Sequence, residues 1–274
     1  SRPSISTERA EIITEFYGRH RGFMSEPVRR ALAFKYLLEH KTIYIGDGEL
    51  IVGEKGPAPK ATPTYPELCC HSLDDLDILH SREKIPFAVS EEARRVYEKI
   101  VIPFWSGNSM RDLLFREMSD DWKAAYEAGI FTEFMEQRSP GHTVLDDKIY
   151  RAGMLDFQKE IERSFTSLDY LADASAYAKE QELFAMHLAS SALVSFAERH
   201  AARARELAAR EADPARRSEL ERIAEVCSRV PARAPRDFHE AIQYYWFVHL
   251  GVTIELNTWD SFSPGHLDRH LEPF

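Results

Sequence analysis

The sequence predicts a mainly α-helical fold that contains one small β-hairpin. Three observations predict it. Apolar residues recur at three- and four-residue spacing along most of the chain, helix-capping residues precede several of these stretches, and one short glycine-containing stretch changes to a period of two. The 274 residues, 44% hydrophobic and 29% charged, are typical of a folded chain with a sizeable core.

The first expected elements are two amphipathic helices, over residues 7–17 and 26–40, each with an apolar stripe opposite charged side chains. Residues 43–53 then change period around the turn-forming Gly46-Asp47-Gly48, which predicts two short strands joined as a hairpin. The proline-rich stretch 55–64 predicts an extended loop or a linker.

The residues expected at helix N-termini predict further helices. Ser90 and Ser119 each precede acidic residues, the pattern of a helix N-cap. A long helical region is expected from Asp146 to about Arg210, because its second half is rich in alanine, leucine and glutamate. Asp213-Pro214 marks the turn into another helix that ends near residue 230.

The closing stretch is different in composition. Residues 237–250 are apolar on nearly every side, which predicts a buried helix that Gly251 ends, followed by a short strand over 252–256. No internal repeat or clear domain boundary is indicated. The last residues, Pro273-Phe274, are apolar and turn-like, so we expect a chain cut from a longer protein.

Composition and charge exclude several classes of function. Lys+Arg number 35 against 45 Asp+Glu, and the net charge of −10 argues against a nucleic-acid partner. No apolar run is long enough for a membrane helix, so no membrane partner is expected. The three cysteines, Cys69, Cys70 and Cys227, cannot form the disulfide framework of a small secreted domain, and we expect a cytoplasmic location.

Two polar residues stand where chemistry is expected. His142 follows Pro140-Gly141, so its imidazole lies on a turn, where it can act as a hydrogen-bond donor, a base or an acid. From this feature alone, a turn histidine bonded to nearby backbone is the favoured interpretation. Asp260 follows the strand expected at 252–256, a position typical of ligand-binding carboxylates, although a local N-cap or turn aspartate is equally compatible.

Other candidates are weaker. His266 and His270 share a helix face, but no third ligand is evident, so no metal site is predicted. In Cys69-Cys70-His71 a thiol adjoins an imidazole, yet neighbouring side chains point apart, and we expect one buried structural cysteine beside an incidental one. The apolar stripe that contains Phe134 indicates core packing.

Several strings, taken together, resemble one family, the glycyl radical enzymes related to pyruvate formate-lyase and the diol dehydratases. The resemblance extends over almost the whole chain, and the segments that carry it are Asp47–Glu54, Pro63–Glu67, Phe131–Val144, Tyr245–His249 and Glu255–Asp260. The Phe-Met-Glu-Gln-Arg-Ser-Pro-Gly-His-Thr and Glu-Leu-Asn-Thr-Trp-Asp runs are the sharper ones. They are most similar to family members that dehydrate trans-4-hydroxy-L-proline.

The resemblance implies a fold and a chemistry. This chain would be the N-terminal helical part and the beginning of the ten-stranded α/β barrel of glycyl radical enzymes. A glycyl radical, installed by a radical-SAM activating enzyme, would generate a thiyl that abstracts a substrate hydrogen. By residue matching, His142 lies near the substrate hydroxyl, Asp260 near the ring amine, and Phe134 forms an aromatic wall. The resemblance also implies a homodimer.

The chain departs from the family pattern in two strings. Neither the Arg-Val-x-Gly-Tyr string of the radical glycine nor the Cys-x-Glu string of the catalytic cysteine occurs here. We therefore expect residues 1–274 to be an N-terminal portion that binds no cofactor itself and is inactive alone. The alternatives are another glycyl radical lyase, such as an isethionate sulfite-lyase or a diol dehydratase, and a non-catalytic helical fragment.

Overall fold

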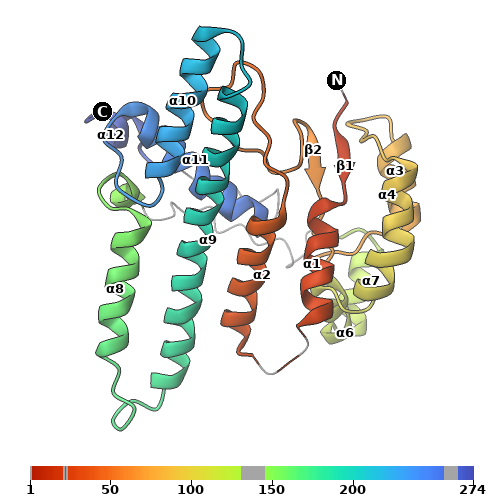
Figure 1. Cartoon of the computed structure of the whole chain (residues 1–274). Coiled ribbons are helices and arrows are strands. Elements are labelled where there is room, and N and C mark those ends of the chain that lie inside the picture. Colours follow the sequence, from red (N-terminus) through yellow and green to blue (C-terminus); the bar gives the residue numbers. More distant parts are fainter. Residues whose placement is uncertain (1, 21, 23, 131–145, 256–264) are drawn as a thin grey trace. The chain divides into compact units, whose positions relative to one another are not determined.

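The computed structural model describes residues 2–20, 22, 24–130, 146–255 and 265–274 (Figure 1). These residues form two compact units. Within the described parts, the first unit comprises residues 2–20 and 55–130, and the second comprises residues 22, 24–54, 146–255 and 265–274. Both units are discontinuous in sequence, so no single linker marks the boundary between them.

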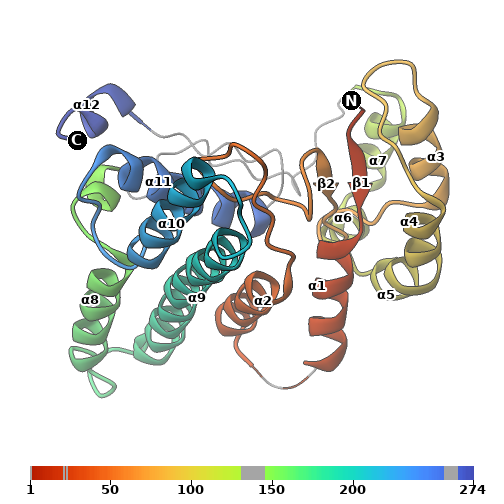
Figure 2. The same cartoon turned by 45° about the horizontal axis from the view of Figure 1, so that its top comes forward.

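The first unit combines a short parallel sheet with small helices. Its elements are β1 (Ser4–Ser6), α1 (Glu8–Arg19), β2 (Ala61–Pro63), α3 (Leu73–Ser81), α4 (Glu91–Val96), the π-helix η1 (Tyr97–Val101), α5 (Ile102–Trp105), α6 (Met110–Glu117) and α7 (Asp120–Glu127). Strand β1 lies beside β2 in parallel, with Ile5 paired to Thr62 (Figure 2). The Arg9 side chain, 4% exposed, donates to the Thr64 carbonyl and lies over the Tyr65 ring.

The second unit is built around one long helix. Its elements are α2 (Glu26–His40), the 3₁₀ helix η2 (Asp146–Tyr150), α8 (Met154–Thr166), α9 (Ala176–Ala208), α10 (Pro214–Arg229), α11 (Phe238–Glu255) and α12 (Leu267–Leu271). Helix α9 packs against α2, α8 and α10, and it lies between α8 and α2 in both views (Figures 1 and 2). Its buried small residues let the neighbouring helices approach closely: Ala192, Ala197, Ala201, Ala204 and Ala208.

Several sequence predictions are confirmed. The mainly α-helical class is correct, and α2 has the expected bounds. Helices α4 and α7 begin after their expected N-caps Ser90 and Ser119, and α10 begins after the expected turn at Asp213-Pro214. The region expected to be helical from Asp146 to Arg210 consists instead of η2, α8 and α9, with turns over 167–175 between the two longer helices. The loop predicted over 55–64 contains β2.

The predicted hairpin at residues 43–53 is wrong, because no strand forms there. Instead, the Gln243 side chain of α11 takes the place of a strand partner: its amide nitrogen donates to the Val52 carbonyl at 2.9 Å, and its oxygen accepts from the Val52 N–H at 2.8 Å. The Trp246 indole likewise donates to the Gly53 carbonyl at 3.0 Å. The alternation of apolar residues in the sequence predicted that a second strand would bind these backbone N–H and C=O groups. In the structure, side chains of α11 bind them instead.

The predicted helix end at Gly251 and the strand over 252–256 are also wrong, because α11 continues to Glu255. A Cβ atom at Gly251 would lie 2.6 Å from Leu193 Cδ2 of α9. The glycine therefore serves the close packing of α11 on α9 and not the termination of the helix. The prediction that this helix is buried holds for its core side chains, such as Tyr244, Phe247 and Leu250, each 0% exposed.

Candidate functional site

The three residues that the sequence assigns to a substrate pocket, Phe134, His142 and Asp260, lie outside the described residues. The structure does describe the chain that follows His142, beginning at Asp146, and the chain on both sides of Asp260. These flanking elements belong to the second unit. Their contacts determine how the two segments with candidate polar residues are attached to the fold.

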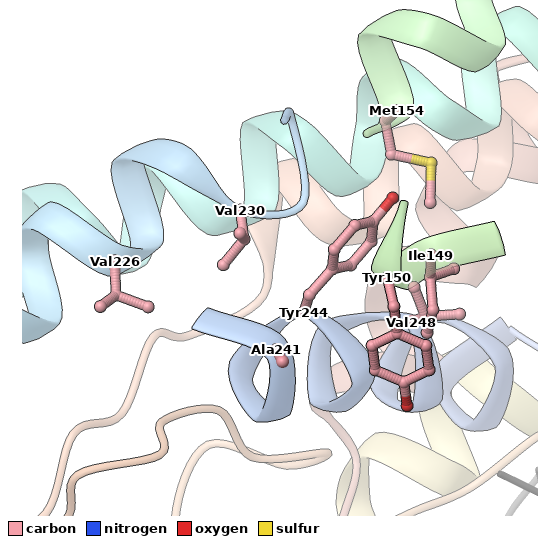
Figure 3. Close-up of a cluster of buried hydrophobic side chains, with 8 residues drawn as sticks. All are labelled: Ile149, Tyr150, Met154, Val226, Val230, Ala241, Tyr244 and Val248. Carbon is pink, nitrogen blue, oxygen red and sulfur yellow. The ribbon is translucent and has the colours of Figure 1, made fainter. Parts of the chain in front are cut away.

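The chain after His142 is attached to a buried cluster on α11. Ile149 and Tyr150 of η2 are 1% and 7% exposed, and they pack with Tyr244 and Val248 of α11 (Figure 3). The Tyr244 hydroxyl donates to the Ala152 carbonyl at 3.1 Å, which fixes the chain beyond η2 as well. We call these side chains, with Met154, Val226, Val230 and Ala241, the anchoring cluster.

Tyr150 of the anchoring cluster and the adjoining Tyr245 have phenols that stay protonated at neutral pH. Burial, together with the nearby Tyr245, raises the pKa of Tyr150 to about 12. Burial also raises the pKa of Tyr245. The Tyr150 hydroxyl is buried and has no hydrogen-bond partner among the described residues. At neutral pH these residues can offer a hydroxyl hydrogen but not a phenolate base.

The chain before Asp260 is described as far as Glu255, and this last part of α11 is held on two sides. Leu250 and Ile254 of α11 are 0% exposed. The Glu255 carboxylate pairs with the Arg30 guanidinium of α2, with Nη2 donating to Oε2 at 3.0 Å. The sequence predicted a strand over 252–256, and the structure shows helix there as far as Glu255, the last described residue before Asp260.

The Asp47–Glu54 string, which is shared with the resembling family, has a packing role. Gly53 has a φ of +125°, and a Cβ atom there would lie 2.5 Å from Leu250 Cδ1. A glycine therefore lets this segment lie directly against α11. The Arg216 guanidinium of α10 holds the turn of the same string by donating to the Gly46 and Glu49 carbonyls, each at 2.9 Å.

Two of the described cysteines, Cys70 and Cys227, are not poised as nucleophiles. Cys69 and Cys70 are both half-buried, and this corrects the expectation of one buried and one incidental thiol. Burial, followed by the charge of Asp112, raises the pKa of the Cys70 thiol to about 12, and burial raises that of Cys227 to about 12. Burial lowers the pKa of the neighbouring His71. Thiols with such raised pKa values are neutral near pH 7, where nucleophilic attack requires a thiolate.

The histidine pair at the end of the chain does not act as one site. His266 is exposed at the N-cap of α12, whereas the His270 imidazole faces Asp146. Among the described residues, no group of three or more His, Cys, Asp or Glu side chains is placed to hold a metal ion. Within the same residues, no helix combines the length and apolarity needed to cross a bilayer.

Comparison with known proteins places this arrangement in a family. The chain is 53% identical to trans-4-hydroxy-L-proline dehydratase of Clostridioides difficile over 272 residues, which are 99% of this chain and 34% of that protein. It is 34% identical over its whole length to isethionate sulfite-lyase of Nitratidesulfovibrio vulgaris, again 34% of that protein. The chain thus spans about a third of the length of these curated relatives.

Solved structures agree with the sequence matches. The crystal structure of hydroxyproline dehydratase from Clostridioides difficile, with trans-4-hydroxy-L-proline bound, superimposes with a TM-score of 0.95 at 52% identity, over 100% of this chain and 35% of that chain. Glycerol dehydratase from Clostridium butyricum superimposes with a TM-score of 0.92 at 31% identity, over 100% and 35%. The model of the pyruvate formate lyase-like family matches residues 1–274. The chain belongs to the pyruvate formate lyase-like family.

Proposed function

We propose that the chain is part of a glycyl radical dehydratase that converts trans-4-hydroxy-L-proline to 1-pyrroline-5-carboxylate and water. One observation carries the proposal: the 53% identity to a trans-4-hydroxy-L-proline dehydratase over 99% of the chain. The identity to isethionate sulfite-lyase is much lower, at 34%, which favours hydroxyproline over a sulfonate substrate. The sequence also carries the Phe131–Val144 and Glu255–Asp260 strings that are typical of such enzymes.

Each candidate residue has a chemical role in this proposal. The ionised Asp260 carboxylate pairs with the protonated ring amine of the substrate, an interaction that is stronger in a dry pocket than in water. His142 hydrogen-bonds the 4-hydroxyl and donates the proton that lets it leave as water. Phe134 packs on the ring and excludes water from the radical intermediate.

The remainder of the longer protein supplies the radical. A glycyl radical, installed by a radical-SAM activating enzyme, and a catalytic cysteine provide hydrogen abstraction from the substrate. Neither the glycine string nor the cysteine string occurs in these 274 residues. We therefore propose that this segment contributes pocket residues and is inactive alone. We also propose that the full-length protein is a homodimer and that it acts in an anaerobic cytoplasm.

The described residues support the roles of the two polar groups indirectly. The anchoring cluster holds the chain that follows His142, and the Arg30–Glu255 pair with the buried face of α11 holds the chain that precedes Asp260. Substrate-positioning groups need such supports, because catalysis depends on their placement.

The test uses the full-length protein, activated anaerobically by its cognate radical-SAM enzyme. We expect trans-4-hydroxy-L-proline to be converted to 1-pyrroline-5-carboxylate, followed by mass spectrometry, with a glycyl radical signal in the electron paramagnetic resonance spectrum. A strong radical signal without product would refute the substrate and keep the radical chemistry. Parallel incubations with isethionate and small diols identify the reaction in that case.

A further inference from the structure

Residues 43–45 form a straight segment whose backbone binds nothing in the described chain. The segment follows α2 in the second unit, and residues 42–46 contain no turn, bend or helix (Figure 1). Among the described residues, no hydrogen bond reaches the N–H or the C=O group of Ile43, Tyr44 or Ile45. The three side chains are half-buried, so this backbone lies near the surface of the unit.

Side chains of the fold hold both ends of this segment. The Arg199 guanidinium of α9 donates to the Lys41 carbonyl at 2.8 Å, and the Lys41 ammonium donates to the Thr42 carbonyl at 3.2 Å. At the other end, the Arg216 guanidinium of α10 donates to the Gly46 carbonyl at 2.9 Å. The segment is therefore held in place from outside, so a strand that pairs with it does not have to order it first.

These bonds determine which edge of the segment faces outward. In an extended chain, the backbone groups of successive residues point to opposite edges, so residues two apart share an edge. The carbonyls of Thr42 and Gly46 accept from side chains of the fold, which places their edge on the inner side. The N–H and C=O groups of Ile43 and Ile45 therefore point away from the fold.

The side chains of the segment are typical of a β-strand. Isoleucine and tyrosine are common in strands, and alternation places Ile43 and Ile45 on one face. The second half of the expected hairpin does not pair with them, because Val52 is bound to the Gln243 side chain of α11. An unpaired edge of this kind binds another extended segment through main-chain hydrogen bonds.

We propose that residues 43–45 are a docking edge for a β-strand from the part of the longer protein that lies outside residues 1–274. The partner strand exchanges hydrogen bonds with the N–H and C=O groups of Ile43 and Ile45, and it carries apolar side chains beside theirs. The proposal rests on the part of the proposed function that makes this chain a segment of a longer protein, and it does not depend on the substrate.

The shortness of the edge identifies the source of the strand. Ile43 and Ile45 offer two N–H and two C=O groups, and each hydrogen bond contributes little net free energy in water. A separate chain also loses its freedom of motion on binding, and stable interfaces bury about 800 Å² per partner, far more than three residues present. A strand of the same protein is already tethered. This chain covers 34% of two curated relatives, which leaves about two thirds of such a protein to supply the strand.

Hydrogen–deuterium exchange of the full-length protein, resolved to single amides by mass spectrometry, tests the proposal. We expect the Ile43 and Ile45 amides to exchange at least about a hundredfold more slowly than the amide of Gly48, which lies in an exposed turn. The Val52 amide, bound to Gln243, is the reference for a protected amide. Exchange of Ile43 and Ile45 as fast as that of Gly48 would overturn the proposal. The measurement requires neither activation nor substrate, so its result is separate from the test of hydroxyproline turnover.

Proline variants of the full-length protein test the main-chain bonds. Ile45→Pro removes one outward N–H, so we expect a melting temperature lower by a few degrees and faster exchange at Ile43. Asp47→Pro is the matched control, because Asp47 is exposed and precedes Gly48, whose φ is +73°, in a turn where proline is favoured. Ile45→Thr removes the apolar side chain but keeps the N–H and the strand propensity. Equal effects of Ile45→Pro and either control would overturn the proposal, and where Ile45→Pro does not fold, the exchange result decides.

A crystal structure of the full-length protein identifies what binds the edge. We expect an extended segment from outside residues 1–274, with its N–H and C=O groups about 2.9 Å from those of Ile43 and Ile45. A strand from a second copy, a side chain, or water alone at this edge would overturn the proposal.

Discussion

Gly153 shows how one residue without a side chain lets two backbone segments touch. A Cβ atom there would lie 2.3 Å from both the Ala232 carbonyl oxygen and Arg233 Cα. The same approach lets the Pro231 carbonyl accept the Met154 N–H at 2.8 Å, at the beginning of α8. Backbone carbonyls from a distant segment therefore satisfy amides that a helix N-terminus leaves unpaired.

We predict that Gly153→Ala lowers the free energy of unfolding by about 3 kcal/mol, because the clashing atoms belong to the backbone and cannot rotate away. Gly18→Ala is the matched control. A Cβ atom at Gly18 of α1 meets nothing closer than 3.9 Å, so this variant should gain about 0.5 kcal/mol from helix propensity. Urea denaturation of the purified chain measures both values. Equal shifts for the two variants would contradict the steric explanation.

His200 makes stability depend on pH. It is 0% exposed, its Nδ1 donates to the Phe196 carbonyl, and burial lowers its pKa to about 3 from 6.5. The folded chain keeps this imidazole neutral, whereas the unfolded chain binds a proton below pH 6.5. The neutral form's full contribution to stability is therefore present above pH 6.5 and is lost progressively as the pH falls toward 3.

We predict that the wild-type chain loses about 2 kcal/mol between pH 6.5 and about pH 5 from this group alone. His200→Asn, whose amide can still donate to the Phe196 carbonyl, should show a flatter dependence, although its stability at neutral pH is lower. Denaturation curves at several pH values measure the slopes, with the exposed His266→Gln as control. An unchanged slope in His200→Asn would show that another group controls the acid sensitivity.

Whole elements were predictable wherever their signals are local. Helix α10 begins after Asp213, whose carboxylate accepts the Ala215 and Arg216 amides, and this capping pattern is visible in the sequence. The same reasoning failed at residues 43–53 and at Gly251, because distant residues decide both places. Gln243 replaces a strand partner in the first case, and the packing of α9 requires the glycine in the second.

We predict that Gln243→Leu destabilises the chain by about 3 kcal/mol, because it leaves the Val52 N–H and carbonyl without partners in a buried place. Hydrogen exchange at the Val52 amide should accelerate in the same variant. Gln181→Leu is the control: this half-buried glutamine accepts one hydrogen bond, from Ser25 on the loop before α2, and its loss should cost under about 1 kcal/mol. Equal losses of stability in the two variants would show that the two Gln243–Val52 hydrogen bonds contribute no more than the single Gln181–Ser25 bond.

At the scale of the whole molecule, the candidate site could be predicted only from the family resemblance. Phe134, His142 and Asp260 were assigned in that way. Their local patterns favour a core residue for Phe134 and a turn histidine for His142, and they fit a cap or turn aspartate equally well for Asp260. The residues that hold these segments in place could not be predicted from the sequence. Arg30 and Glu255 are 225 residues apart, and no periodicity pairs side chains at such a separation.

For the activated full-length protein, we predict that Asp260→Asn lowers kcat/KM for hydroxyproline by about a hundredfold, mainly through a higher KM, because it removes the proposed partner of the ring ammonium. His142→Gln should lower mainly kcat, because glutamine cannot donate a proton to the leaving hydroxyl. Asp268→Asn, at an exposed position on α12, is the control for charge removal. Steady-state kinetics measures both parameters. Near-normal turnover in both variants would show that the roles assigned to Asp260 and His142 are wrong.

The pairing of α2 with α9 has a consequence for how the chain is made. The Arg199 guanidinium of α9 donates to the Lys41 carbonyl just beyond α2 at 2.8 Å, across 158 residues of sequence. Helix α2 therefore leaves the ribosome long before α9 exists, with Phe34, Leu37 and Leu38 of its apolar stripe still uncovered. Contacts between such distant segments form slowly, and exposed stripes attract other chains in the meantime. The apolar stripe of α2 therefore stays exposed during synthesis until α9 has been made.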